Sequence, residues 1–413
     1  MSRSPRTASR PRPGPRPAGP EPLAVYVHWP YCARICPYCD FNVVRDRGQA
    51  EQQAMLAGAI LADLQGHRAL TGPRRLVSVY LGGGTPSLMP PEWVQAIVGM
   101  ARGLWPGEGV VEVTLEANPT DAEAGRFAAL AAAGVNRLSL GLQAIDDEAL
   151  AFLGRNHTAT EGVRAAAIAR AVFPRLSLDL IYARPGQTPW AWAAELETAT
   201  ALGAEHLSPY QLTIEAGTAF DRAVRRSQWA PPDPETAAAF YDTTQEVLAA
   251  RGYDAYEVSN HARGEGARSA HNLAYWRGYE YVGVGPGAHG RLTLEGGRTA
   301  IRAAARPADY IQTVREHDLG WAERETLTPR QVAEERLLTG LRTVEGVALV
   351  ELAPLGVGPG HPMLVELADA GLLRLDGHRL VATPAGRLVL DRVTLELSGA
   401  ETSPALPFAA ENA

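Results

Sequence analysis

Short apolar runs alternate with amphipathic segments along most of the chain after residue 22. Six of these runs have the length and composition of buried parallel strands, and they are followed by polar or glycine-rich motifs. We expect strands at residues 23–28, 76–81, 110–115, 137–141, 176–182 and 204–212. Between them, apolar residues at helical spacing predict helices at residues 49–70, 93–104, 121–133, 160–172 and 190–202.

This alternation predicts a parallel sheet with helical crossovers. In barrel-type β/α folds the ligand chemistry lies on the loops after the strands, and the polar motifs of this chain occupy those positions. We therefore expect an α/β fold whose larger part is a partial six-stranded (β/α)6 barrel, similar to a TIM barrel, with its site at the carboxyl ends of the strands.

A smaller α+β module is predicted at the C-terminal end. Helical spacing at residues 329–341 and 363–370 precedes two strand-like segments at 372–376 and 379–382. Asp376-Gly377 between the two strands is a strong hairpin signal. Helices followed by a hairpin resemble a winged helix. A structural or lid-like role is favoured over DNA reading, because the basic residues are scattered and the chain is acidic.

The pattern divides the chain into five segments. Residues 1–22, rich in proline and arginine, are predicted to be a disordered tail. A transit peptide is the alternative, but the prolines oppose an amphipathic helix. Residues 23–255 form the predicted barrel core, 256–326 a connecting region, 327–400 the C-terminal module and 401–413 a second tail.

Composition restricts the class of protein only broadly. The net charge of −7 gives no strong attraction to nucleic acid, so no nucleic-acid partner is expected. No apolar run approaches the ~20 residues that span a bilayer. Three cysteines are too few for a disulfide framework and suit a reducing compartment, so we expect a cytoplasmic protein.

All three cysteines lie within eight residues, in the sequence Cys32-Ala-Arg-Ile-Cys36-Pro-Tyr-Cys39. Three thiolates at this spacing suit a [4Fe–4S] cluster with one iron lacking a protein ligand, because electron carriers of the ferredoxin type supply four cysteines. The remaining iron can then bind a small molecule. Zinc bound with the help of His28 is one alternative, although the usual second ligand pair is missing. Inert, buried cysteines are the other alternative.

The segment YVHWPYCARICPYCDFN at residues 26–42 resembles the cluster loop of radical S-adenosylmethionine (SAM) proteins. It is most similar to the branch that contains oxygen-independent coproporphyrinogen III oxidase and the haem chaperones of the HemW type. The resemblance extends from about residue 23 to about residue 397. It includes GGGTP at 82–86, SPYQLTIE at 208–215, YEVSN at 256–260 and GVGPGAH at 283–289.

This resemblance implies the cofactors and their ligands. Cys32, Cys36 and Cys39 would bind three irons, and SAM would chelate the fourth. One electron from the reduced cluster then cleaves SAM and releases a 5′-deoxyadenosyl radical. Arg155 would suit the SAM carboxylate, and Glu116 would accept hydrogen bonds from the ribose or the amino group. The implied SAM contacts are Tyr26, Tyr38, Gly83, Gly84, Thr85, Glu116, Gln143, Arg155 and Asp179.

Each SAM contact has an ordinary alternative as a surface, packing or N-cap residue when it is taken alone. Their placement at successive strand ends favours the ligand role.

Two features separate the two branches of the resemblance. The oxidase has a fourth cysteine two residues after the third, where this chain has Phe41. The segment His271-Asn272-Leu273-Ala274-Tyr275-Trp276 matches HNxxYW, a signature of HemW-type proteins that is associated with haem binding. Imidazole is a good axial ligand, and aromatic rings stack on a macrocycle. The implied haem contacts are His271, Asn272, Tyr275 and Trp276. The alternative is a core histidine with two packed aromatic residues.

The resemblance favours a haem chaperone that passes haem to apo-haemoproteins, with the cluster and SAM supporting or gating the transfer. Respiratory-chain proteins are the expected recipients, with at most transient contact with a membrane protein. The sequence does not decide between a monomer and a homodimer. No catalytic residue is assigned. One alternative is a coproporphyrinogen III dehydrogenase that removes CO2 from propionate side chains, which Phe41 and HNxxYW oppose. The others are a radical SAM enzyme with an unrelated substrate and, weakest, nucleic-acid binding by the C-terminal module.

Overall fold

The computed structural model describes residues 20–399, and one sheet of 12 strands runs through the larger part of this range. The strand order is β14-β13-β12-β11-β1-β4-β5-β6-β7-β8-β10-β9. The predicted tails at 1–22 and 401–413 lie outside the described residues, except that β1 already begins at Pro22. Within residues 20–399 no helix is long and apolar enough to cross a membrane.

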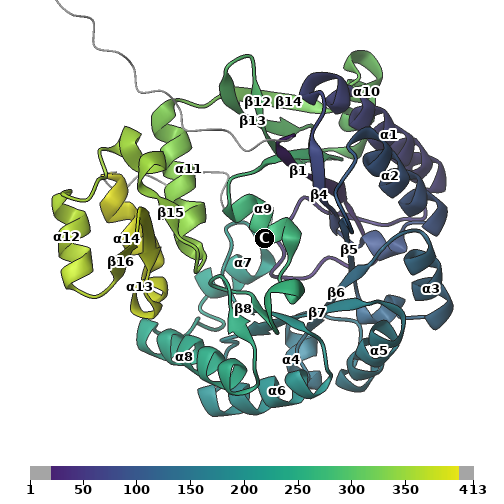
Figure 1. The fold of residues 1–413 in the computed structure, drawn as a ribbon. Helices are drawn as coiled ribbons and strands as arrows, with labels where there is room; N and C mark the ends of the chain where they lie inside the picture. Colours follow the sequence, from purple (N-terminus) through teal and green to yellow (C-terminus); the bar gives the residue numbers. More distant parts are fainter. Residues whose placement is uncertain (1–19, 400–413) are drawn as a thin grey trace, which may run out of the picture.

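The centre of the sheet is the predicted barrel, in which six strands pair in parallel with their neighbours and curve around a common interior (Figure 1). These strands are β1 (Pro22–Trp29), β4 (Arg75–Gly83), β5 (Glu112–Ala117), β6 (Arg137–Gln143), β7 (Arg175–Tyr182) and β8 (His206–Gln211). The outer helices are α1 (Ala50–Thr71), α2 (Pro91–Leu104), α3 (Ala124–Ala132), α5 (Ala159–Val172) and α6 (Pro189–Ala201). The predicted fold class is thus confirmed.

Several predicted boundaries differ from the structure by one to three residues, and two of the differences have a clear cause. The strand predicted from residue 110 begins at Glu112, because Val110 lies on the surface with 89% of its area exposed. The helix predicted over residues 121–133 is split into a 3₁₀ turn, Pro119–Asp121, and α3, which begins after Glu123.

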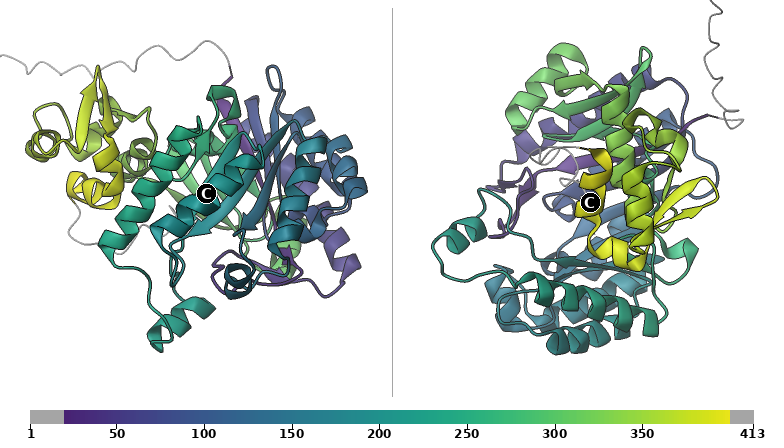
Figure 2. Two further views of the ribbon diagram at one scale, coloured as in Figure 1. Left: turned by 90° about the horizontal axis from the view of Figure 1, so that it is seen from below. Right: turned by 90° about the vertical axis from the view of Figure 1, so that its left-hand side faces the viewer.

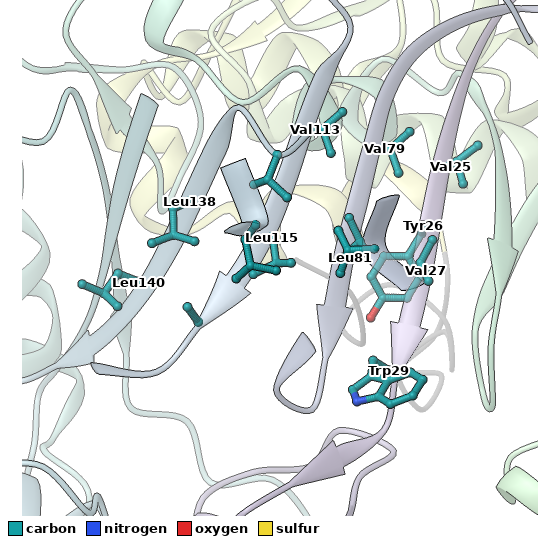
Figure 3. Packing of buried hydrophobic residues seen from close by; sticks show 14 of the residues in the cluster. Val25, Tyr26, Val27, Trp29, Val79, Leu81, Val113, Leu115, Leu138 and Leu140 are labelled. Atoms are coloured by element: carbon teal, nitrogen blue, oxygen red, sulfur yellow. The ribbon is translucent and has the colours of Figure 1, made fainter. Parts of the chain in front are cut away.

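Side chains alternate between the two faces of each barrel strand. Apolar residues of β1, β4, β5 and β6 belong to one buried cluster, which Figure 3 shows for Val25, Val79, Leu115 and Leu138, among others. The residues between them in the sequence point into the barrel, and many are polar. The interior-facing residues that line a cavity include Tyr80, Glu116, Arg137, Ser139, Asp179, Ser208 and Tyr210. The barrel interior is therefore a polar cavity and not a filled core.

Residues 254–326 extend the sheet at both edges. β11 (Glu280–Val284) pairs in parallel with β1, and β12 (His289–Leu294), β13 (Gly297–Ala303) and β14 (Trp321–Thr326) follow in antiparallel order. At the other edge lie β10 (His261–Ala262) and β9 (Asp254–Ala255). The predicted boundary between residues 255 and 256 stays a prediction.

Other helices support the barrel from several sides. The short helix α9 (Ala270–Trp276) contacts β4, β1 and β11 and lies near the middle of Figure 1. α10 (Pro307–His317) packs on α1, and α8 (Pro234–Ala250) packs on α6. The remaining two are α4 (Asp147–Phe152) and α7 (Ala219–Arg225).

The C-terminal module is a lobe beside the barrel, with its own hydrophobic core (Figure 2). It contains α11 (Pro329–Arg342), β15 (Val347–Ala348), a 3₁₀ segment (Leu349–Leu355), α12 (Pro362–Asp369), β16 (Leu373–Asp376), β17 (Arg379–Ala382), α13 (Pro384–Leu388) and α14 (Leu390–Ser398). Gly377 has φ 60° in the turn of the predicted β16–β17 hairpin. The predicted module of helices and a hairpin is confirmed.

Candidate functional site

A cavity of about 660 Å³ opens at the carboxyl ends of the barrel strands and extends down into the barrel. Such a volume lies within the ~300–1,000 Å³ that small-molecule sites usually have. The cysteine loop, the strand ends, α9 and two helices of the C-terminal module all contribute to its walls. Every predicted site residue lines this cavity except Tyr26, His271 and Tyr275.

The cysteine loop is held at the mouth of the cavity by Asn42. The Asn42 side chain donates hydrogen bonds of 2.8 Å to the carbonyls of Pro286 and Ala305. Backbone bonds from Val44 and Asp46 to the start of the loop close its base. The segment GVGPGAH, more than 240 residues away in the sequence, therefore anchors the loop that carries the three thiols.

His28 does not have the free nitrogen that a zinc ligand needs. One ring nitrogen is hydrogen-bonded to the Tyr26 hydroxyl at 3.0 Å, and the other to the Asn42 carbonyl at 2.9 Å. Burial lowers the pKa of His28 to about 4, so the ring is neutral. Within the described residues, no three histidine, cysteine or acidic side chains converge on one point as a single metal ion requires. The zinc alternative is therefore not supported by this arrangement.

The three thiols fit a cluster whose irons would bind them as deprotonated thiolates. Burial raises the pKa of Cys32 to about 11 and of Cys39 to about 12, so the free thiols are protonated at neutral pH. Two sulfurs receive hydrogen bonds: Thr85 Oγ1 lies 3.6 Å from Cys32 Sγ, and Arg155 Nη1 lies 3.4 Å from Cys36 Sγ. Hydrogen bonds to sulfur and partial burial are what tune iron–sulfur centres.

A hydrogen-bond network joins the cysteine loop to three strand ends. Thr85 follows β4 and accepts a bond of 3.1 Å from Asn118, which follows β5. Arg155 donates to the Asn118 side chain and, at 3.1 Å, to the carbonyl of Gly141 in β6. The network keeps Arg155 extended along the top of the barrel, where a guanidinium can bind a carboxylate.

The glycine loop after β4 allows the chain to pass very close to β1. Gly83 has φ 103°, and a β-carbon there would lie 2.5 Å from the His28 ring. Its N–H donates to Glu116 Oε2 at 3.0 Å, and the Tyr80 hydroxyl donates to Glu116 Oε1 at 2.8 Å. Only glycine fits this position, and its close approach puts a backbone N–H beside the Glu116 carboxyl.

Two partly buried carboxyl groups face the cavity with raised pKa values. Burial raises the pKa of Glu116 to about 7, with a further contribution from the negative charge of Asp179. Burial likewise raises the pKa of Asp179 to about 6, although the Ser139 hydroxyl donates to it at 3.0 Å. Perturbed carboxyls in a cleft are typical of functional sites.

Gln143 lies at the end of β6 in an unusual backbone conformation. Its φ of 65° is left-handed, and the pairing of β6 with β7 shifts register between Gly141 and Gln143. Left-handed backbone at a residue other than glycine costs energy and is concentrated at ligand sites. Here it accompanies a side chain that lines the cavity.

His271 faces away from the cavity, toward the sheet. Its two ring nitrogens are hydrogen-bonded to the Ser78 hydroxyl at 2.9 Å and to the Tyr275 hydroxyl at 2.8 Å. Only 1% of the residue is exposed, and the ring stacks on Tyr80 with centroids 4.8 Å apart. Burial lowers the pKa of His271 to about 3. The structure thus gives this histidine two partners and packs it in the core.

The other half of the HNxxYW motif reaches the cavity. Asn272 and Trp276 line it from α9. The guanidinium of Arg342, at the end of α11, lies 4.6 Å from the centre of the Trp276 ring. Arg342 also bonds the buried carboxylate of Glu257 at 3.0 Å. The YEVSN segment, the HNxxYW motif and the C-terminal module therefore meet at one corner of the cavity.

The sequence did not single out three residues that the structure places at the site: Asn118, Arg137 and Arg342. Asn118 directly follows β5, two residues after Glu116, so its position at a strand end was the available signal. Arg137 shares its strand face with Ser139, Gly141 and Gln143, and this period of two was the available signal. Arg342 had no local signal, because its partners Glu257 and Trp276 lie 85 and 66 residues away in the sequence.

Comparison with known proteins defines the class. Residues 26–199 match the Radical SAM superfamily, and residues 327–389 match the HemN C-terminal domain. The chain therefore belongs to the radical SAM family, with a HemN-type C-terminal module. Membership of this family implies a [4Fe–4S] cluster and SAM as cofactors.

Individual relatives place the chain more narrowly. It is 40% identical to the cattle (Bos taurus) protein "Radical S-adenosyl methionine domain-containing protein 1, mitochondrial", over 92% of this chain and 88% of that one. It is 36% identical to "Heme chaperone HemW" of Mycobacterium tuberculosis, over 94% and 97%. The solved structure of coproporphyrinogen III oxidase (HemN) from Escherichia coli shares the fold, with a TM-score of 0.76 over 92% and 90% at 22% identity. The chain is thus a HemW-like radical SAM protein.

Proposed function

We propose that this protein is a haem chaperone, which binds haem in the cavity beside the cluster site and hands it to apo-haemoproteins. The observation that carries the proposal is the placement of the HNxxYW helix α9, which lines the cavity with Asn272 and Trp276. Relatives covering almost the whole chain are named haem chaperones. The proposed location is the cytoplasm, and the proposed recipients are respiratory-chain proteins.

The residues of this chain fit the two cofactors of the family. The cluster, when bound, supplies one-electron chemistry and an iron that SAM chelates. Thr85, Asn118 and Arg155 orient the cysteine loop and present a cation at its edge. Glu116 offers an acceptor beside the glycine loop. These residues are also the proposed SAM contacts, together with the others predicted from the sequence.

The proposal assigns different roles to the parts of the HNxxYW motif. Trp276 offers a flat apolar surface to the macrocycle, and Asn272 offers a polar group. His271 positions the helix, because both of its nitrogens are already hydrogen-bonded and coordination of haem iron would break one of these bonds. We therefore propose Trp276 and Asn272 as haem contacts and His271 as a positioning residue.

Anaerobic haem titration of the cluster-reconstituted protein, followed through the Soret band, tests both points. We expect stoichiometric binding by the wild type and weaker binding by Trp276→Leu, by about tenfold. His271→Ala should lose about 3 kcal/mol of unfolding free energy, from two buried hydrogen bonds and ring packing, while bound haem keeps its wild-type Soret maximum. His317→Ala on α10, where the side chain is 67% exposed, is the control.

Three outcomes would change this proposal. A folded His271→Ala variant with a shifted Soret maximum would make His271 the axial ligand. Unchanged binding by Trp276→Leu would remove the motif from the haem site. If the reconstituted wild type binds no haem, the coproporphyrinogen III dehydrogenase becomes the better hypothesis, and conversion of coproporphyrinogen III to protoporphyrinogen IX is the assay that decides it.

A further inference from the structure

Arg137 is a buried guanidinium that lacks the partners such a group normally has. It begins β6, lines the cavity, and is only 2% exposed. The one hydrogen bond of its side chain among residues 20–399 is a long contact of 3.5 Å from Nη1 to Thr114 Oγ1. Its Nε has no partner in the same range. Burying a charge with so few hydrogen bonds is costly, and proteins keep such groups where a ligand completes them.

The carboxylates near Arg137 are held by other groups. Glu112 bonds Arg175 at 2.6 Å and accepts from the backbone N–H groups of Ala270 and His271 at 3.1 and 3.0 Å. Asp179 accepts from Ser139. Neither acid comes within the 4.0 Å of an ion pair with Arg137 in the described chain, although both interact with it electrostatically. The guanidinium fork therefore stays open toward the cavity.

Arg137 and Arg155 mark different depths of the cavity. Arg155 donates to the Gly141 carbonyl beside the cysteine loop. Arg137 lies four residues earlier on the same strand, which corresponds to about 13 Å along a strand. The two side chains share no hydrogen-bond partner in the described chain: Arg155 bonds Cys36, Asn118 and Gly141, whereas Arg137 contacts Thr114. Arg155 is the proposed partner of the SAM carboxylate, so Arg137 is available for a different anion.

We propose that Arg137 binds a carboxylate of the second ligand that enters this cavity. The fork of a guanidinium matches a carboxylate with two parallel hydrogen bonds, and the Tyr210 hydroxyl is a further polar group that lines this cavity. If the proposed function holds, on which this assignment of the ligand rests, the group is a propionate of the tetrapyrrole. Arg137 is then the residue that fixes which edge of the macrocycle points into the barrel.

A small probe tests the carboxylate site independently of haem. Thermal unfolding of the cluster-reconstituted protein is followed with millimolar propionate and with its neutral analogue propionamide. We expect propionate, and not propionamide, to raise the Tm of the wild type. Arg137→Gln should lose this response, and Arg137→Lys should keep part of it.

Without ligand, Arg137→Gln should be at least as stable as the wild type, because it removes a poorly paired buried charge. A propionate response that survives in Arg137→Gln overturns the proposal. The proposal is also overturned if Arg137→Gln is less stable than the wild type without ligand and propionate does not raise the Tm of the wild type. Arg137 then has a purely structural role.

The haem experiment then identifies the ligand. Wild type and Arg137→Gln are titrated with haem and with haem dimethyl ester, in which both propionates are blocked. We expect Arg137→Gln to bind haem about 10- to 100-fold more weakly, because the charge-assisted hydrogen bonds to the propionate are lost, and to bind the ester as well as the wild type does. Equal losses for both ligands would contradict the assignment to a propionate.

The propionate and haem experiments together distinguish failure of the carboxylate site from failure of the haem function. A wild type that binds neither porphyrin but responds to propionate would contradict the haem function and leave the carboxylate site standing. A wild type that binds haem but shows no Arg137-dependent response to propionate would support the haem function and contradict the carboxylate site.

Discussion

Single residues set the charge balance of the cavity. Glu116 and Asp179 lie partly buried in the barrel interior, and each is held by hydroxyl or amide donors that only partly offset the cost of burial. Both carboxyls therefore hold a proton more tightly in the folded protein than in the unfolded chain. Stability must then depend on pH through these two groups.

Glu116 provides a measurable case. Burial raises its pKa from 4.5 to about 7, so its contribution to stability is complete below about pH 4.5 and is lost as the pH rises through 7. Between pH 5 and 8 the unfolding free energy of the cluster-free wild type should fall by about 2–3 kcal/mol more than that of Glu116→Gln. Urea unfolding at both pH values measures the difference.

A matched control for this experiment is Glu366→Gln, because Glu366 lies exposed on α12. It should follow the wild-type profile. If Glu116→Gln also follows the wild-type profile, another group is responsible for the pH dependence.

At the scale of elements, the strand–loop–helix repeat positions the site. Each barrel strand brings its last residues to the same rim of the barrel, and at Gly83, the last residue of β4, a β-carbon would lie 2.5 Å from the His28 ring. The repeat itself was predictable, because apolar runs and helical spacing are local signals. The open interior was harder to predict, because the strands have the pattern of continuously buried strands. Their polar residues were interpreted as SAM contacts only at the strand ends.

The glycine loop allows a sharp test at this scale. Gly83→Ala places a methyl group 2.5 Å from the His28 ring at φ 103°, so we expect a loss of about 3 kcal/mol or more in unfolding free energy. Gly186→Ala, in the loop after β7, has a similar positive φ of 76° but nothing within 4 Å. It should cost only about 1 kcal/mol. Equal losses in urea unfolding would show that crowding against His28 is unimportant.

At the scale of the whole molecule, the C-terminal module completes the cavity. Its helices α11 and α14 contribute to the cavity wall. The module contacts the barrel part through the YEVSN segment. Val258 packs against the core of the module, and the Tyr256 carbonyl accepts a hydrogen bond from the N–H of Val344 at 3.1 Å. In this structure the module therefore forms part of the cavity wall.

Arg342 tests how firmly the module is docked. Arg342→Met leaves the buried Glu257 carboxylate without its cation, which should cost about 3 kcal/mol. It should also increase protease cleavage near residues 327–345. Arg374→Met on the same module removes only the exposed pair with Asp376, so its effect should stay within about 0.5 kcal/mol. If both variants resist proteolysis like the wild type, the ion pair does not hold the module.

The sequence by itself determined the α/β repeat, the hairpin of the C-terminal module, the cysteine trio and the strand-end motifs, because each is a pattern among residues close together in the chain. The tertiary structure alone decided which side chains meet. It pairs β11 with β1, hydrogen-bonds His271 to Ser78 across 193 residues and leaves Arg137 open to the cavity. The physical reason is that burial and hydrogen-bond partners depend on contacts between distant segments, and local periodicity carries no record of them.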